Sequence, residues 1–152
     1  MKLKHFHYFW VTAIIILSLG IISLFDEESV IDINVHDTYF VIHHSHLAFF
    51  LSFFYGLFGL IYWSHYSSNV ELVSRLTTIH TVVTIGSIPV YFLGLKVFEL
   101  YRQDGDFPLF DDLSNENLFI TIIFLLVLLA QVLFLINIIL SLVKHLTKRI
   151  KE

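Results

Sequence analysis

The 152-residue chain contains no cysteine, only two prolines and few charged residues. Without cysteine it cannot form a disulfide framework, a thiolate metal site or a thioether link to a cofactor. Charged residues make up 14% of the chain and hydrophobic residues 57%, far from the balance of soluble domains. So much apolar surface needs lipid as its solvent. The net charge of −4 gives no sign of a nucleic-acid partner. The sequence therefore predicts an integral membrane protein in contact with the bilayer.

Four apolar stretches are long enough to cross the bilayer core, which takes about 20 helical residues. We predict an all-α four-transmembrane-helix bundle, forming one domain over residues 1–152, with helices at about 8–25, 38–63, 76–98 and 118–143. Pro89 lacks a backbone donor and should kink the third helix. Gly56 and Gly59 should permit close packing of the second helix against a neighbour.

The first stretch could instead be a signal peptide. No small-x-small cleavage site precedes the acidic Asp26-Glu27-Glu28, however, and Tyr8 and Trp10 lie where an interfacial belt would place them. We therefore expect a retained first helix.

Basic residues gather at one end of the predicted helices. That end carries Lys2, Lys4, Arg75, Lys144, Lys148, Arg149 and Lys151. At the other end Lys96 and Arg102 are the only basic residues, among many acidic ones. Because cytoplasmic loops are enriched in Lys and Arg, both termini are predicted to lie on the cytoplasmic side. We expect the membrane to be a bacterial cytoplasmic membrane.

Four of the nine histidines lie in one stretch, His36-Asp37-Thr38-Tyr39-Phe40-Val41-Ile42-His43-His44-Ser45-His46. An ionisable side chain in a bilayer is costly unless it pairs, binds a ligand or lines a cavity, so the stretch indicates a functional site. Residues two apart on a helix are separated by about 200°, so His44 and His46 should face opposite sides. One small metal ion could not easily bind both, whereas two flat cofactors could each take one. The pattern favours haem iron.

The same stretch resembles subunit I of the haem-copper terminal oxidases, the cytochrome c and quinol oxidases. The resemblance continues through Gly56, Gly59 and Trp63, then Ile79-His80, then Phe92-Leu93-Gly94-Leu95. It covers nearly the whole chain and corresponds to the last four helices of that subunit. It implies that His44 binds the oxygen-reducing haem and His46 the low-spin haem.

The resemblance also implies three further site residues. His36 and Asp37 match a magnesium-type site near the outer surface, where we expect at most weak binding of a divalent cation, since Asp37 is the one carboxylate donor of the motif. Arg102 stands near the arginine pair that holds haem propionates, with Lys96 as a helper. Both could equally balance the acidic loops. His43 departs from the family, which usually has a small residue there.

The eight preceding helices of the family, with its copper ligands and cross-linked tyrosine, have no counterpart in the sequence. Oxygen reduction needs a haem and a copper facing each other, and no spare imidazole cluster opposes His44, so no copper site is evident. We expect respiratory electron transfer only together with other oxidase-type subunits or a second copy. The acidic outer face could attract a basic cytochrome, although acidic outer loops also follow from the positive-inside bias.

Two other functions fit the sequence. A structural or assembly subunit could keep the helices and bind no cofactor. Alternatively, His43 and His46, three residues apart and so on one helix face, could bind a transition metal, with His36 nearby.

The remaining polar residues suggest packing roles. His80 should lie roughly ten or more ångströms from the level of His44 along the helices, so we expect a structural hydrogen bond rather than haem ligation. Gln131 and Asn137 should hydrogen-bond between helices. His65 is expected to be solvated or at headgroup level.

Overall fold

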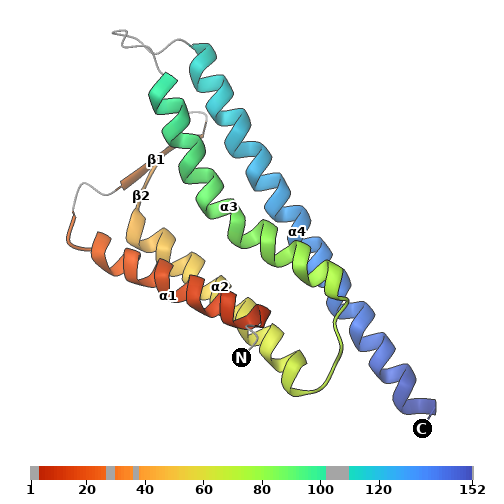
Figure 1. Ribbon diagram of the computed structural model, residues 1–152. Coiled ribbons are helices and arrows are strands. Elements are labelled where there is room, and N and C mark those ends of the chain that lie inside the picture. Colours follow the sequence, from red (N-terminus) through yellow and green to blue (C-terminus); the bar gives the residue numbers. More distant parts are fainter. Residues whose placement is uncertain (1–3, 27–29, 36–37, 102–109, 152) are drawn as a thin grey trace. The chain divides into compact units, whose positions relative to one another are not determined.

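The computed structural model describes residues 4–26, 30–35, 38–101 and 110–151. Along the chain follow α1 (His5–Ser23), β1 (Val30–Val35), β2 (Thr38–His43), α2 (His44–Ser67), α3 (Ser74–Tyr101) and α4 (Phe110–Lys151) (Figure 1). All four helices are long and apolar enough to cross a membrane, which confirms the predicted all-α membrane fold.

The chain divides into two compact units, Met1–Asn69 and Val70–Glu152, and each is described by itself. The first holds α1, α2 and the two strands, and the second holds α3 and α4. The single-domain bundle and the cytoplasmic position of both termini stay predictions.

The predicted start of the second helix was wrong. Residues 38–43 form strand β2, which pairs antiparallel with β1 from Val35↔Thr38 to Val30↔His43, and the helix begins at His44. The six residues of each strand are mostly β-branched or aromatic, and such residues fit a pleated ladder. The apolar run alone could not distinguish a strand from the first turns of a helix.

The other helices differ from the prediction at their ends. α1 begins and ends two or three residues earlier than expected, and α3 extends to Tyr101 with Pro89 inside it, so the kink stays a prediction. α4 is longest, at 42 residues, and continues beyond its apolar part at both ends.

Within the first unit, α1 and α2 pack through rings and small residues. Phe9 is fully buried and contacts the rings of Tyr55, Phe58 and Tyr62, with centroid separations of 6.0, 5.7 and 5.4 Å. A Cβ added to Gly59 would lie 2.2 Å from Cδ1 of Trp10, which confirms the close approach expected at this glycine. These contacts fix one face of α2 against α1.

Gly56 does not share that role. A Cβ built on it would meet no atom within 4 Å, so Gly56 makes no close contact with α1, and its packing against another helix stays a prediction. The residue lies beside the interface rather than in it.

Within the second unit, α3 and α4 meet along a polar seam, made of Thr77, His80 and Thr84 on α3 and Gln131, Asn137 and Ser141 on α4. Nδ2 of Asn137 donates to the Thr77 hydroxyl at 2.9 Å, and Nε2 of Gln131 donates to the Thr84 hydroxyl at 3.2 Å. The Ser141 hydroxyl donates to the backbone carbonyl of Glu71. The interhelical hydrogen bonds predicted for Gln131 and Asn137 are therefore confirmed.

Candidate cofactor site at the start of helix α2

The histidine stretch lies where a strand passes directly into a membrane-spanning helix. β2 ends at His43, which has φ −66° and ψ 137°, and α2 begins at His44 without an intervening loop. His44 and His46 therefore occupy the first turn of α2. The helical geometry on which the haem prediction depends is present from His44 onward, but not before it.

His43 is the N-cap of α2, a role that the sequence analysis missed. Its Nε2 lies 3.1 Å from the carbonyl oxygen of Asp26, which can only accept, so Nε2 carries the proton. Its Nδ1 then accepts from the backbone N–H of Ser45 at 3.2 Å and from the Ser45 hydroxyl at 2.7 Å. Both ring nitrogens are engaged, and the ring joins the start of α2 to the chain that follows α1.

This engagement bears on the alternative metal site. The rings of His43 and His46 do lie near one another, with centroids 6.2 Å apart, as their spacing suggested. However, His43 has no nitrogen left for a metal ion. Among the residues that the structure describes, no group of three or more His, Asp or Glu side chains could hold a metal.

The side of α2 below His46 is open. At about 100° per residue, Phe50, Phe53 and Leu57 follow His46 along one face of the helix. Their side chains are 60%, 65% and 37% exposed within the chain. No hydrogen bond to a ring nitrogen of His46 is present in the described part of the chain, and the ring contacts that of His43. This side offers an imidazole above a wide apolar and aromatic surface.

The side of α2 below His44 is different. His44 is itself exposed, but Tyr55 and Tyr62, which follow on its face, are only 6% and 3% exposed because they pack against Phe9 of α1. The two histidines thus face opposite sides of α2, as predicted, and among the described residues of this unit the longer uncovered apolar surface lies on the His46 side.

Three predicted site residues, His36, Asp37 and Arg102, lie outside the described residues. Lys96, the suggested helper of Arg102, is an exposed residue of α3.

Two other histidines have roles in the fold. His80 is fully buried, with Nε2 3.0 Å from Oε1 of Gln131 and its ring stacked on Phe134 at a centroid separation of 4.5 Å. The predicted structural hydrogen bond is confirmed. His65, expected to be solvated, is only partly exposed: Nδ1 donates to the carbonyl of Ile61 at 2.9 Å, and Nε2 is buried without a partner among the described residues.

Comparison with known proteins relates part of this chain to a respiratory oxidase subunit. It is 39% identical over 72 residues to cytochrome c oxidase subunit 1 of Thermostichus vulcanus, covering 43% of this chain and 13% of the relative. It is 28% identical over 108 residues to cytochrome c oxidase subunit 1 of Albinaria turrita, covering 66% of this chain and 54% of the relative. The chain thus spans about half or less of the curated relatives it matches.

No family model matches the sequence, and no solved structure matches it. The partial similarity and the four apolar helices together identify an integral membrane protein related to respiratory oxidase subunits.

Proposed function

We propose that this chain is a haem-binding membrane protein of the cytochrome c/quinol oxidase subunit I type, acting in respiratory electron transfer within a larger assembly. The observation that carries the proposal is the pair His44 and His46 in the first turn of α2, facing opposite sides of a membrane-spanning helix. The partial similarity to cytochrome c oxidase subunit 1 supports it.

The residues around His46 fit a haem. The imidazole has no hydrogen bond from the described residues to either ring nitrogen, and three apolar side chains below it present an exposed surface for a flat macrocycle. A bound haem would supply one-electron chemistry at its iron. His46 would bind as neutral imidazole through one nitrogen, with the other oriented by an acceptor. The chain's part would then be to present the His46 imidazole to the haem and to exclude water with Phe50 and Phe53.

His44 is proposed to bind the oxygen-reducing haem, by resemblance to the oxidase subunit. Tyr55 and Tyr62 are already packed on α1, so a second macrocycle would contact Leu47 and Leu51 rather than these tyrosines. The second axial ligand of a haem at His46, and the copper with its imidazoles, would come from other polypeptide. Oxidase-type subunits or a second copy are accordingly the proposed partners.

The same proposal includes roles for residues outside the histidine pair. Arg102 would pair with haem propionates, and His36 with Asp37 would bind a divalent cation weakly at the outer boundary. The acidic outer loops would attract a basic cytochrome, and the membrane would be a bacterial cytoplasmic membrane.

Reduced-minus-oxidised spectra of the full chain, purified from membranes with its natural partners and ample haem, test the proposal. His46→Ala should abolish a low-spin signal, whereas His44→Ala should remove only a high-spin signal, because the two rings face opposite ways. His145→Ala, a histidine of α4 outside the motif, serves as control. Equal loss in both variants would indicate one shared site. Absence of haem from the unsubstituted protein would reject the proposal.

A structural or assembly subunit without a cofactor is the second candidate. The polar seam favours this structural role for the second unit, because buried polar side chains of α3 and α4 hydrogen-bond to each other or to the backbone. Haem-free purified protein that still co-purifies with oxidase subunits would support this function.

A further inference from the structure

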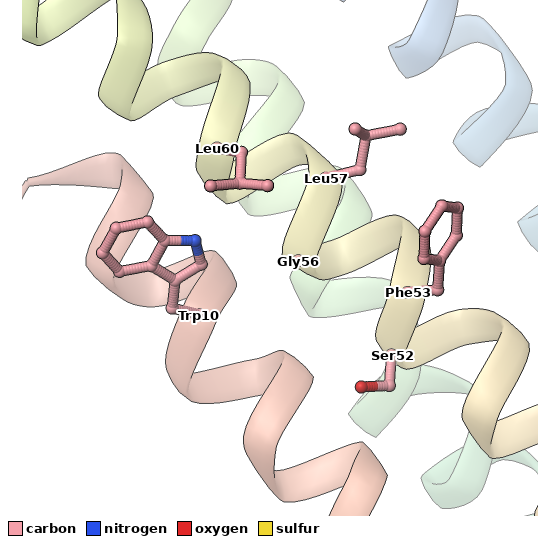
Figure 2. Close-up of a pocket in the computed structure, with 6 residues that line it drawn as sticks. All are labelled: Trp10, Ser52, Phe53, Gly56, Leu57 and Leu60. Atoms are coloured by element: carbon pink, nitrogen blue, oxygen red, sulfur yellow. The ribbon is translucent and has the colours of Figure 1, made fainter.

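A groove of about 360 Å³ opens along the seam between α1 and α2. We call it the Trp10 groove, and its lining residues are Trp10, Ser52, Phe53, Gly56, Leu57 and Leu60. Figure 2 shows Trp10 on the α1 side and the other five residues along α2. On α2 its residues lie 6 to 14 positions beyond His46, or about 9 to 21 Å along the axis, so the groove lies beyond the proposed haem ligand and shares Phe53 and Leu57 with the surface below it.

The missing side chain of Gly56 forms part of the groove floor. Since a Cβ there would contact nothing within 4 Å, the space at this residue is not filled by either helix. Ser52, a polar lining residue, donates its hydroxyl to the carbonyl of Ala13 at 2.9 Å. The groove is thus almost wholly apolar, and it lies between two membrane-spanning helices.

Trp10 supplies the one hydrogen-bond donor that is not already used. Its indole nitrogen lies on the side of the ring that faces α2 (Figure 2). No acceptor for this N–H is found among the described residues. An N–H group without an acceptor is unfavourable in an apolar medium, so the position suits a ligand with a carbonyl oxygen next to an apolar chain.

A basic residue lies beyond that end of the groove. Lys4 precedes Trp10 by six residues, about 9 Å along α1, and its Nζ lies 3.2 Å from the ring centroid of Tyr66, which follows Leu60 on α2 by six residues. Three features therefore follow one another along the unit: the Lys4 cation, the indole N–H of Trp10, and an apolar groove. The groove is about 12 Å long, from Leu60 to Ser52. A phospholipid presents the complementary groups in the same order: phosphate, ester carbonyl and acyl chain.

We propose that the Trp10 groove binds one acyl chain of a membrane phospholipid, with its ester carbonyl accepting the indole N–H of Trp10 and its phosphate near Lys4. A helix from a second copy fits less well. Phe53 and Leu57, 65% and 37% exposed, flank Gly56 and would hold another backbone away from it.

Bromine quenching of tryptophan fluorescence tests this proposal. The full chain with Trp63→Phe, so that Trp10 is the single tryptophan, is titrated in detergent with phosphatidylcholine carrying a dibrominated acyl chain. Quenching should saturate at about one lipid per chain. Gly56→Leu, which fills the groove, should weaken the saturable binding at least tenfold. Gly86→Leu on α3 is the matched control, because a Cβ at Gly86 also meets nothing within 4 Å, and it should change nothing.

A diether lipid with the same brominated chain tests the hydrogen bond. Lacking carbonyls, it should bind about fivefold more weakly than the diester, as expected for one net hydrogen bond. This comparison of the two lipids needs no groove variant, so it still tests lipid binding in the groove if Gly56→Leu fails to fold. Linear, unsaturable quenching that is equal in all variants would overturn the proposal. So would equal binding of the two lipids, or cross-linked dimers that Gly56→Leu abolishes, since these would place a second copy in the groove.

Discussion

Replacing Asn137 with Leu should destabilise the α3–α4 pair by several times more than any exposed polar substitution. Asn137 is fully buried in the polar seam. Its Oδ1 accepts from the backbone N–H of Val73 at 2.9 Å, and its Nδ2 donates to the Val73 carbonyl at 3.4 Å and to the Thr77 hydroxyl at 2.9 Å. Val73 directly precedes α3, so one side chain of α4 satisfies a backbone donor at that helix end.

The size of the effect follows from the number of bonds lost. Interhelical hydrogen bonds in membrane proteins contribute about 0.6 kcal/mol each on average, so three bonds give about 2 kcal/mol. Leaving the Val73 N–H buried without an acceptor raises the cost further, because an unsatisfied donor loses its full solvation. Leu is similar in size to Asn, so the substitution tests polarity rather than volume.

Unfolding of the full chain in mixed micelles, with increasing SDS, measures the change in free energy. Thr121→Val on α4 is the control, because Thr121 is exposed and its hydroxyl bonds only to the carbonyl of Asn117 in the same helix. Combining Asn137→Leu with Thr77→Val should cost less than the two single changes together, since both remove the same bond. A loss for Asn137→Leu no larger than that for Thr121→Val would refute the assigned role of the seam.

Three further outcomes are expected. His80→Leu should lower the stability of the α3–α4 pair by about 1–2 kcal/mol in the same assay but leave any haem spectrum unchanged, because Nε2 of the ring is already bonded to Gln131. Gly59→Ala should destabilise the first unit by about 1–3 kcal/mol through its clash with Trp10, whereas Gly86→Ala should be neutral or slightly stabilising; equal effects would contradict the packing. Single cysteines in the cysteine-free chain should be labelled from outside the cell between the ends of α3 and α4 and from the cytoplasm near both ends of the chain, and the reverse pattern would reject the predicted topology.

Much of the fold could be predicted from composition and spacing. The four spans follow from apolar runs of bilayer length, because in lipid each backbone N–H and C=O must be paired within its own segment, which makes the helix the local solution. The roles of His80, Gln131 and Asn137 also follow from the lipid environment. Polar side chains in a bilayer have few hydrogen-bond partners other than groups on neighbouring helices. The opposite facing of His44 and His46 needs only the helical repeat.

Residues 38–43 show where local reasoning fails. Their apolar, β-branched pattern suits a strand or a helix, and the choice depends on pairing with Val30–Val35. That pairing also makes His43 the last residue of a strand and hence the N-cap of α2, which engages both of its ring nitrogens. His43, which spacing alone placed in the alternative metal site, is therefore a capping residue.

The sequence by itself determined that this is a four-span membrane protein with an oppositely facing histidine pair, because segment length, polarity and helical repeat are local properties. Only the tertiary structure decided which side of α2 is open. Phe9 of α1 covers the face below His44, while the face below His46 and the space at Gly56 stay uncovered. Both outcomes depend on which residues of α1 meet α2, and that is fixed by packing between segments some forty residues apart rather than by either segment alone.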